Sequence, residues 1–347
     1  MFRGLLLAGA IAALPTLALA GDLTPKAAGE VVDQVVAGLA VYMDPAIGAK
    51  AQATLKAHRN DYMKLDTREA FAAAVSKDLY EVTHDKHLKV SILTVDAGKQ
   101  ARLTDEQQAL VDKRLAYGLM GIRHLPANIG YLKLSYFEQG EAGATLVETA
   151  LSLLQNTDAL IIDLRQNRGG GGASDEAFLG HLSRDAIPMA KITWRTEGGG
   201  TEVMQRAPRK PTGQPLYADK PVYVLTSSRT FSAAEAFAYD LKAARRATLV
   251  GEVTGGGANP SNMPTPLSYG FRVFVPNGKV THPTTGTNWE GVGVQPDVVV
   301  PVDQALTEAY GLALAAAKPL VSTAKSEAER AQAMADPKGT LLADQAL

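Results

Sequence analysis

The sequence of 347 residues contains no cysteine. This absence excludes disulfide bonds, thiolate metal ligands and a cysteine nucleophile, and it leaves no thiol to carry a lipid anchor. The net charge is also small. A value of −1 with 20% charged residues provides no strong electrostatic field that would favour binding of nucleic acid or anionic lipid. Stability must therefore come from a packed core, and a chain of this length can bury a large one.

Metal-binding patterns are missing as well. Six histidines are scattered along the chain, and His84 and His87 stand three apart without the carboxylate spacing of a His-Glu-x-x-His motif. We therefore predict no metal site and no cofactor.

The longest apolar run lies at the N-terminus. It extends from Leu5 to Leu19, follows Arg3, and ends in Ala18-Leu19-Ala20. A positive start, a short apolar stretch and an Ala-x-Ala site are typical of a secretory signal peptide. We expect residues 1–20 to be such a peptide, cut after Ala20, and the protein to be periplasmic or secreted. The run is too short and too alanine-rich for a membrane span, and no later segment qualifies.

The remaining chain divides by its hydrophobic pattern. Apolar residues at helical spacing predict an N-terminal helical domain over residues 21–86. Residues 87–320 alternate strand-like and helix-like runs, which indicates an α/β domain. The segment 321–347 is polar, and we expect it to be a frayed or disordered tail.

Within the α/β region the expected elements are specific. Strands are predicted at 88–95, 129–137, 159–164, 192–195, 222–225, 247–251 and 298–302, and helices at 144–154, 178–182, 231–244 and 302–317. The charged stretch 97–115 is interpreted as a loop or a helix. Residues 267–275 and Val280 suggest a hairpin with Asn277-Gly278 as its turn.

Ser232 is the first candidate functional residue. A β-branched apolar run from Val222 passes through a short polar turn and becomes a helix at this serine. Free N–H groups at a helix start favour an anion beside the hydroxyl, as in hydrolases that expose a nucleophile at a strand–turn–helix junction. The alternative is that Ser232 only caps the helix, with Glu235 completing a capping box.

Three other segments offer partners for a serine nucleophile. His87 lies where the helical segment meets the first strand, where it is either a general base or a surface histidine. The run Gly169–Gly172 follows a buried strand, and its backbone N–H groups are accessible to a ligand because glycine has no side chain. The alternative interpretations of this run are a phosphate-binding loop and a flexible turn. Glu290, between Trp289 and Gly291, is either a shielded carboxylate that orients the base or an exposed turn residue.

These segments together resemble a known family. The segments Asp163–Gly170, Ser232–Glu235 with Gly251–Pro260, His282–Asp297 and Asp85–Leu88 are similar to motifs of serine peptidase family 41, the C-terminal processing or tail-specific proteases. The last two resemble the branch with tricorn core protease and interphotoreceptor retinoid-binding protein. The likeness covers roughly residues 25–315.

The resemblance implies an α/β fold, a mixed sheet with flanking helices and a ClpP/crotonase-like core, with an N-terminal helical bundle. It implies Ser232 as nucleophile, His87 as base and Glu290 as orienting carboxylate, with an oxyanion hole made by the N–H of Ala233 and that of Gly169 or Gly170. The implied partner is a peptide or protein substrate. No nucleic acid is expected, and the oligomeric state is left open.

Two departures from the family pattern matter. The lysine of the family's Ser-Lys dyad falls where this chain has Gly255-Gly256-Gly257, and Lys242 is too far along the helix to replace it. Lys86 occupies the fourth position of a tricorn-like tetrad, where the family has serine. The stretch from Val95 to Ile129 is also too short for the PDZ domain usual in tail-specific proteases. The alternative function is a non-catalytic retinoid- or lipid-binding protein of the same fold.

Overall fold

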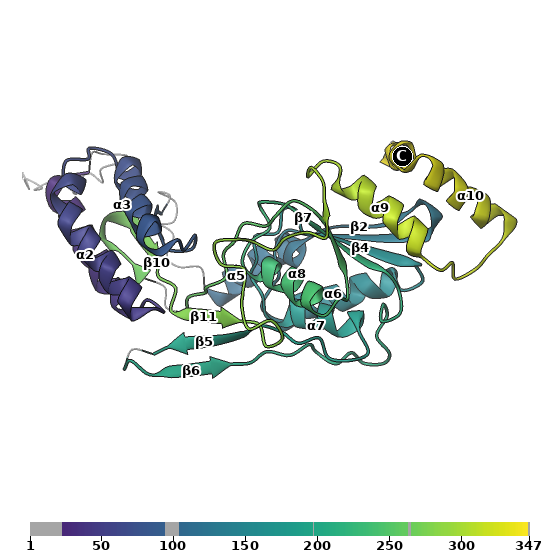
Figure 1. The fold of residues 1–347 in the computed structure, drawn as a ribbon, viewed down its shortest axis with the longest axis horizontal. Helices are drawn as coiled ribbons and strands as arrows, with labels where there is room; N and C mark the ends of the chain where they lie inside the picture. The colour runs from purple at the N-terminus through teal and green to yellow at the C-terminus, as the bar shows by residue number, and fades with distance from the viewer. Residues whose placement is uncertain (1–22, 94–103, 197, 263–264, 346–347) are drawn as a thin grey trace, which may run out of the picture.

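A computed structural model describes residues 23–93, 104–196, 198–262 and 265–345 of the chain (Figure 1). The expected signal peptide, residues 1–20, lies outside these ranges. Within them, every helix is too short or too polar to cross a lipid bilayer.

A mixed six-stranded sheet forms the centre of the molecule. Its strand order is β12-β8-β7-β4-β3-β2, and all neighbours are parallel except the antiparallel pair β2 and β3. The strands are β2 (Leu119–Leu125), β3 (Ile129–Leu134), β4 (Ala159–Asp163), β7 (Val222–Thr226), β8 (Thr248–Gly251) and β12 (Val298–Val299). The predicted α/β class is confirmed, although β2 was not predicted from the sequence.

Helices cover both faces of this sheet, which explains why its middle strands β4 and β7 are buried throughout. Leu160 and Ile162 of β4 face α6 (Glu141–Leu153), α7 (Ala173–Leu182) and α8 (Ala233–Ala243). Ala159 and Ile161 face α9 (Ala305–Ala316) on the other side. Figure 1 shows α6, α7 and α8 grouped together and α9 apart from them. Side chains of successive strand residues point to opposite faces, so each strand contributes to both cores.

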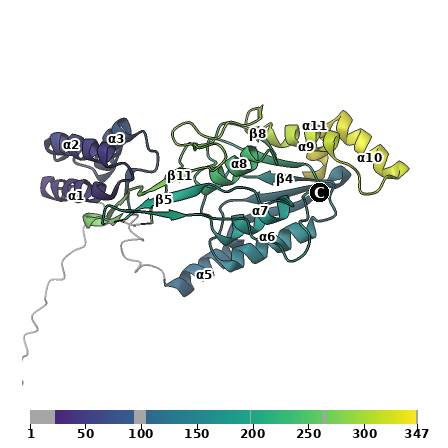
Figure 2. The ribbon, with the colours of Figure 1, turned by 60° about the horizontal axis from the view of Figure 1, so that its bottom comes forward.

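The helices α1 (Pro25–Gly38), α2 (Pro45–Tyr62) and α3 (Arg68–Thr83) lie at one end of the molecule (Figure 2). Each begins at a side-chain cap, provided by Thr24, Asp44 and Thr67 in turn. The predicted helical segment is therefore present.

This helical segment does not close its core alone. It packs against a three-stranded sheet of β1 (Lys89–Ile92), β10 (Phe271–Phe274) and β9 (Thr265–Pro266). We call α1–α3 with this sheet the N-terminal module. Phe71 of α3 lies 5.2 Å, centroid to centroid, from Phe271 of β10. A segment some 200 residues later thus completes the module, which local periodicity does not reveal.

The predicted hairpin around Asn277-Gly278 is wrong. β10 belongs to the N-terminal module, whereas β11 (Gly278–Thr281) pairs with β5 (Lys191–Arg195), which in turn pairs with β6 (Thr201–Met204). A side chain at Gly278 would meet the ring of Trp194 at 2.7 Å. Gly278 is therefore required for close contact with an aromatic ring and not for a turn.

The expectation of a frayed tail is also wrong. Residues 324–345 form α10 (Ala324–Ala335) and α11 (Pro337–Gln345), which pack near α9 through the buried side chains of Ala333 and Leu341. Arg330 Nη2 donates to the carbonyl of Ala317 at 2.7 Å. Few apolar residues suffice here, because the helices cover an existing core instead of building one.

The remaining elements are short. They are α5 (Asp105–Arg114), within the stretch interpreted as loop or helix, and the 3-10 turns at Leu39–Val41, Ala116–Gly118, Pro126–Asn128 and Ser268–Gly270.

Candidate active site

Ser232 sits in a strained turn at the start of α8. Its φ of 57° and ψ of −124° are unusual for a residue with a side chain. The Ser232 carbonyl accepts from the N–H groups of Glu235 and Ala236, while its hydroxyl makes no cap hydrogen bond with the helix. Glu235 makes its half of the predicted capping box, because its carboxylate accepts the Ser232 N–H, but no hydrogen bond to the Ser232 hydroxyl is present in the described ranges. The hydroxyl is therefore left available for chemistry.

A buried carboxylate holds this turn. Glu235 accepts from the N–H of Ser232 at 2.8 Å, from the N–H groups of Gly256 at 2.6 Å and Gly257 at 2.9 Å, and from the hydroxyl of Thr254. Burial raises the pKa of Glu235, and these donors oppose the rise. The sequence predicted Glu235 only as a partner in a helix cap; in the structure its carboxylate also ties the Ser232 turn to the glycine turn at 255–257.

Replacing Glu235 by Gln puts an NH2 group against N–H donors. We expect Glu235→Gln to lower the free energy of unfolding by about 2–3 kcal/mol, because buried donors lose a charged acceptor. Urea denaturation measures the loss. Glu202→Gln, at an exposed position of β6, is the matched control and should change little. Equal stability of the two variants would contradict the role given to Glu235.

The glycine run lies directly against Ser232. All four residues, Gly169–Gly172, have positive φ, and a Cβ at Gly169 would stand 2.8 Å from the Cβ of Ser232. The Gly169 N–H is occupied by Asn167 Oδ1 at 2.8 Å. The N–H groups of Gly170 and Ala233, by contrast, have no hydrogen-bond partner in the described ranges. Of the two glycines proposed from the sequence, Gly170 is thus the one with a free donor.

The close approach of Gly169 to Ser232 has a measurable cost when a methyl group is added. Gly213 has a similar φ of +115°, but open space around it, so Gly213→Ala introduces backbone strain of about 1–2 kcal/mol alone. Gly169→Ala, with φ of +106°, adds a steric clash to this strain. We expect its loss of unfolding free energy to exceed that of Gly213→Ala by at least about 1 kcal/mol. Equal losses would show that the contact with Ser232 is not tight.

His87 follows the C-terminal end of α3. The helix stops at His84, whose φ of 54° is left-handed, and the chain then turns so that the His87 N–H donates to Asp85 Oδ1 at 2.9 Å. The imidazole lies 4.6 Å from the ring of Phe231 and 5.3 Å from that of Phe274, centroid to centroid. Phe231 directly precedes Ser232, so this contact brings His87 to the serine turn. Burial lowers the pKa of His87 to about 4, which keeps the ring neutral near pH 7.

Glu290 reaches the same place from the loop before β12. Its Oε2 accepts from the N–H groups of Ala258 at 2.6 Å and Asn259 at 3.0 Å. The neighbouring Trp289 is buried, and its indole N–H donates to the carbonyl of Gly257 at 3.0 Å. Burial raises the pKa of Glu290, and the backbone N–H groups of Ala258, Asn259 and Lys86, with the charge of Lys86, offset part of the rise. The shielded environment expected for this carboxylate is present.

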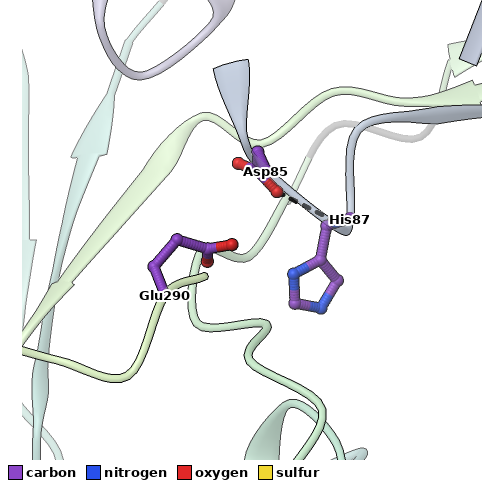
Figure 3. Close-up of side chains that lie close together, drawn as sticks. All are labelled: Asp85, His87 and Glu290. Carbon is purple, nitrogen blue, oxygen red and sulfur yellow. Dashed lines mark hydrogen bonds between the residues drawn. The ribbon is translucent and has the colours of Figure 1, made fainter. Parts of the chain in front are cut away.

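Asp85, His87 and Glu290 converge, as Figure 3 shows. One nitrogen or oxygen atom of each lies within 4.8 Å of the others. Both His87 Nδ1 and Glu290 Oε1 are buried without a hydrogen-bond partner in the described ranges. From the sequence, His87 and Glu290 were predicted to lie together only because of the resemblance to the family, and Asp85 was given no role. The one local signal for Asp85 is its place two residues before His87, where its side chain can accept the His87 N–H.

A buried carboxylate beside a second carboxylate makes stability depend on pH. Burial and the charge of Glu290 raise the pKa of Asp85 from 3.8 to about 7. The folded protein therefore holds this proton more tightly than the unfolded chain. The resulting contribution to the free energy of unfolding is present in full below pH 3.8. That stability is lost as the pH rises through 7.

Asp85→Asn removes this dependence. The difference in unfolding free energy, variant minus wild type, should grow in favour of the variant by at least about 1 kcal/mol between pH 5 and pH 8. Urea denaturation at both pH values measures it, with exposed Asp303→Asn as control. A difference independent of pH would contradict the raised pKa.

The two lysines singled out in the sequence have other contacts. Lys86 is exposed, and its Nζ donates to the carbonyl of Gly255 at 2.7 Å, joining the N-terminal module to the glycine turn. Lys242 Nζ pairs with Asp297 at 2.6 Å. Lys242 is therefore engaged elsewhere, in agreement with its predicted distance from Ser232.

Comparison with known proteins concerns the family and the fold. Residues 128–300 match the model of peptidase family S41. A carboxyl-terminal-processing protease of Synechocystis is 28% identical over 266 residues, which are 74% of this chain and 58% of that protein. A carboxy-terminal-processing protease of Bartonella bacilliformis is 30% identical over 190 residues, covering 53% and 41% of the two chains.

The fold has solved counterparts. A structure from Parabacteroides merdae, described as a candidate peptidase, aligns with a TM-score of 0.58 at 17% identity over 86% of this chain and 99% of its own. At that identity the likeness concerns the fold alone.

The α/β core of this chain is thus a peptidase fold, with a serine at a strained helix start. Residues 128–300 belong to peptidase family S41. The chain spans about half the length of the curated relatives it matches.

Proposed function

We propose that this protein is a serine peptidase that hydrolyses peptide bonds through an acyl-enzyme. The Ser232 hydroxyl attacks the substrate carbonyl and passes its proton to His87 Nε2. The imidazolium returns this proton to the leaving amine, and water then releases the acyl group by the same route. Glu290 orients the ring through Nδ1. The N–H groups of Ala233 and Gly170 stabilise the oxyanion.

The main support is the geometry around Ser232. A residue with a side chain is held at positive φ, and its hydroxyl accepts no helix N–H. The N–H groups of Ala233, the next residue, and of Gly170, in the glycine run that contacts Ser232, have no partner in the described ranges. Backbone strain of this kind persists only where surrounding contacts impose it, and here Glu235 imposes it. A merely structural turn needs neither the strain nor the free donors.

The state of His87 also supports the proposal. A base must be neutral to accept a proton, and the lowered pKa of His87 keeps it neutral over most of the physiological range. His87 Nδ1 and Glu290 Oε1 have no partners in the free protein, in the ranges described. One ligand atom of each residue lies within 4.8 Å of the other, so a hydrogen bond between the two side chains requires one to approach the other. Such hydrogen bonds often tighten only when substrate binds.

We further propose that the substrate is a peptide or protein segment bound between the N-terminal module and the α/β core, since His87 and Ser232 come from these two parts. The curated relatives are named for processing at the carboxyl terminus. Export to the periplasm or outside the cell remains part of the proposal. The comparisons do not favour the alternative of a retinoid- or lipid-binding protein.

Covalent labelling tests the assignment of the nucleophile. Wild-type protein should react with a fluorophosphonate, and Ser232→Ala should lose at least about 99% of the labelling, because the variant lacks the nucleophilic oxygen. The melting temperature of the variant should stay within about 2 °C of wild type, since only an oxygen atom is removed. Ser228→Ala, at an exposed position in the same turn, is the matched control and should label normally. Persistent labelling of Ser232→Ala would refute the proposal.

A further inference from the structure

The space shared by Asp85, His87 and Glu290 has properties that hydrolysis alone does not require. Hydrolysis needs one carboxylate beside the imidazole, and the structure places two. Ligand atoms of the three residues lie within 4.8 Å of one another. Two of the candidate atoms, His87 Nδ1 and Glu290 Oε1, are fully buried and unpartnered in the described ranges. An unpaired buried polar atom destabilises the folded protein, so its presence indicates a bound ligand or a functional role.

The negative charges in this space are only partly compensated, since the charge of Lys86 lowers the pKa of Glu290 but is not in direct contact with it. Within the described ranges, neither Asp85 nor Glu290 forms an ion pair with lysine or arginine. The nearest lysine in sequence, Lys86, points its Nζ at the carbonyl of Gly255. A small dication would neutralise both carboxylates at once.

The existing hydrogen bonds leave room for coordination. Asp85 Oδ1 accepts from the His87 N–H at 2.9 Å, and Asp85 Oδ2 accepts from the Tyr42 hydroxyl at 3.2 Å. Each carboxylate oxygen has a second lone pair. Glu290 Oε2 is held by Ala258 and Asn259, which fixes the carboxylate and leaves Oε1 free. In Figure 3 the Glu290 carboxylate points toward the other two side chains.

We propose that Asp85, His87 and Glu290 form a Zn²⁺ site that reversibly switches off the active site. One imidazole nitrogen and two carboxylate oxygens are a donor set that Zn²⁺ accepts, with a fourth position left for water. Ligand atoms on a tetrahedral Zn²⁺ lie about 3.3 Å apart. In the structure the three ligand atoms lie within 4.8 Å of one another, so side-chain rotations that move each atom by about 1 Å bring them to this spacing.

The inhibitory effect follows from proton placement and rests on the proposed function. A neutral imidazole that binds a metal through Nδ1 must carry its proton on Nε2. Nε2 is the atom that has to accept the Ser232 proton, so the metal-bound ring cannot act as base. The metal also occupies Glu290, which no longer orients the ring.

Direct metal binding tests the site without any need for activity. We would titrate Zn²⁺ into the full-length Ser232→Ala protein, free of a polyhistidine tag, against a chromophoric zinc chelator. One Zn²⁺ per chain should bind, and Glu290→Gln and Asp85→Asn, each combined with Ser232→Ala, should weaken binding at least tenfold. His84→Ala is the matched control, because this exposed histidine lies three residues from His87; it should bind as before.

The outcomes separate the two proposals. Absence of binding to Ser232→Ala, or equal binding after Glu290→Gln, overturns the Zn²⁺ site. Should Glu290→Gln fail to fold, Asp85→Asn decides, together with the rise in melting temperature that Zn²⁺ causes in Ser232→Ala. Fluorophosphonate labelling of wild type should be blocked by Zn²⁺ and restored by EDTA. Protein that binds Zn²⁺ but is never labelled retains the site and refutes the peptidase proposal instead.

Discussion

The arrangement of the site depends on one buried carboxylate, that of Glu235. Its oxygens bind the N–H of Ser232 on one side and those of Gly256 and Gly257 on the other. This single group therefore fixes the strained serine turn and the glycine turn that lies beside it. A Cβ at Gly257 would stand 2.8 Å from the His87 ring, so the same turn also sets where the imidazole can lie.

The site is divided between two parts of the molecule. The α/β core provides Ser232, Gly170 and Glu290, whereas His87, Asp85 and the flanking ring of Phe274 belong to the N-terminal module. The module is attached through contacts such as Lys86 to Gly255 and Arg195 to the carbonyl of Tyr42. Because the proposed base and the proposed nucleophile come from different parts, the relative position of these parts determines whether the site is complete.

Sequence patterns predicted the elements of the core well, because β4 and β7 are short, predominantly apolar and bounded by turn residues. They failed where pairing is not local. Residues 265–274 join a module built mainly from the first 92 residues, and Asn277-Gly278 imitates a hairpin turn while packing against Trp194. The candidate site was found through motifs, but Asp85 was missed, since a lone aspartate beside a histidine has no periodic or spacing signal. The C-terminal helices were missed because they bury few apolar side chains.

The most direct test of the central claim, that Ser232, His87 and Glu290 act together beside free N–H donors, is a crystal structure of the protein after reaction with a fluorophosphonate. The account predicts phosphorus bonded to Ser232 Oγ and a phosphoryl oxygen within about 3 Å of the nitrogens of Ala233 and Gly170. It also predicts His87 Nδ1 hydrogen-bonded to Glu290. An adduct on another residue, or a phosphoryl oxygen directed away from both N–H groups, would contradict it.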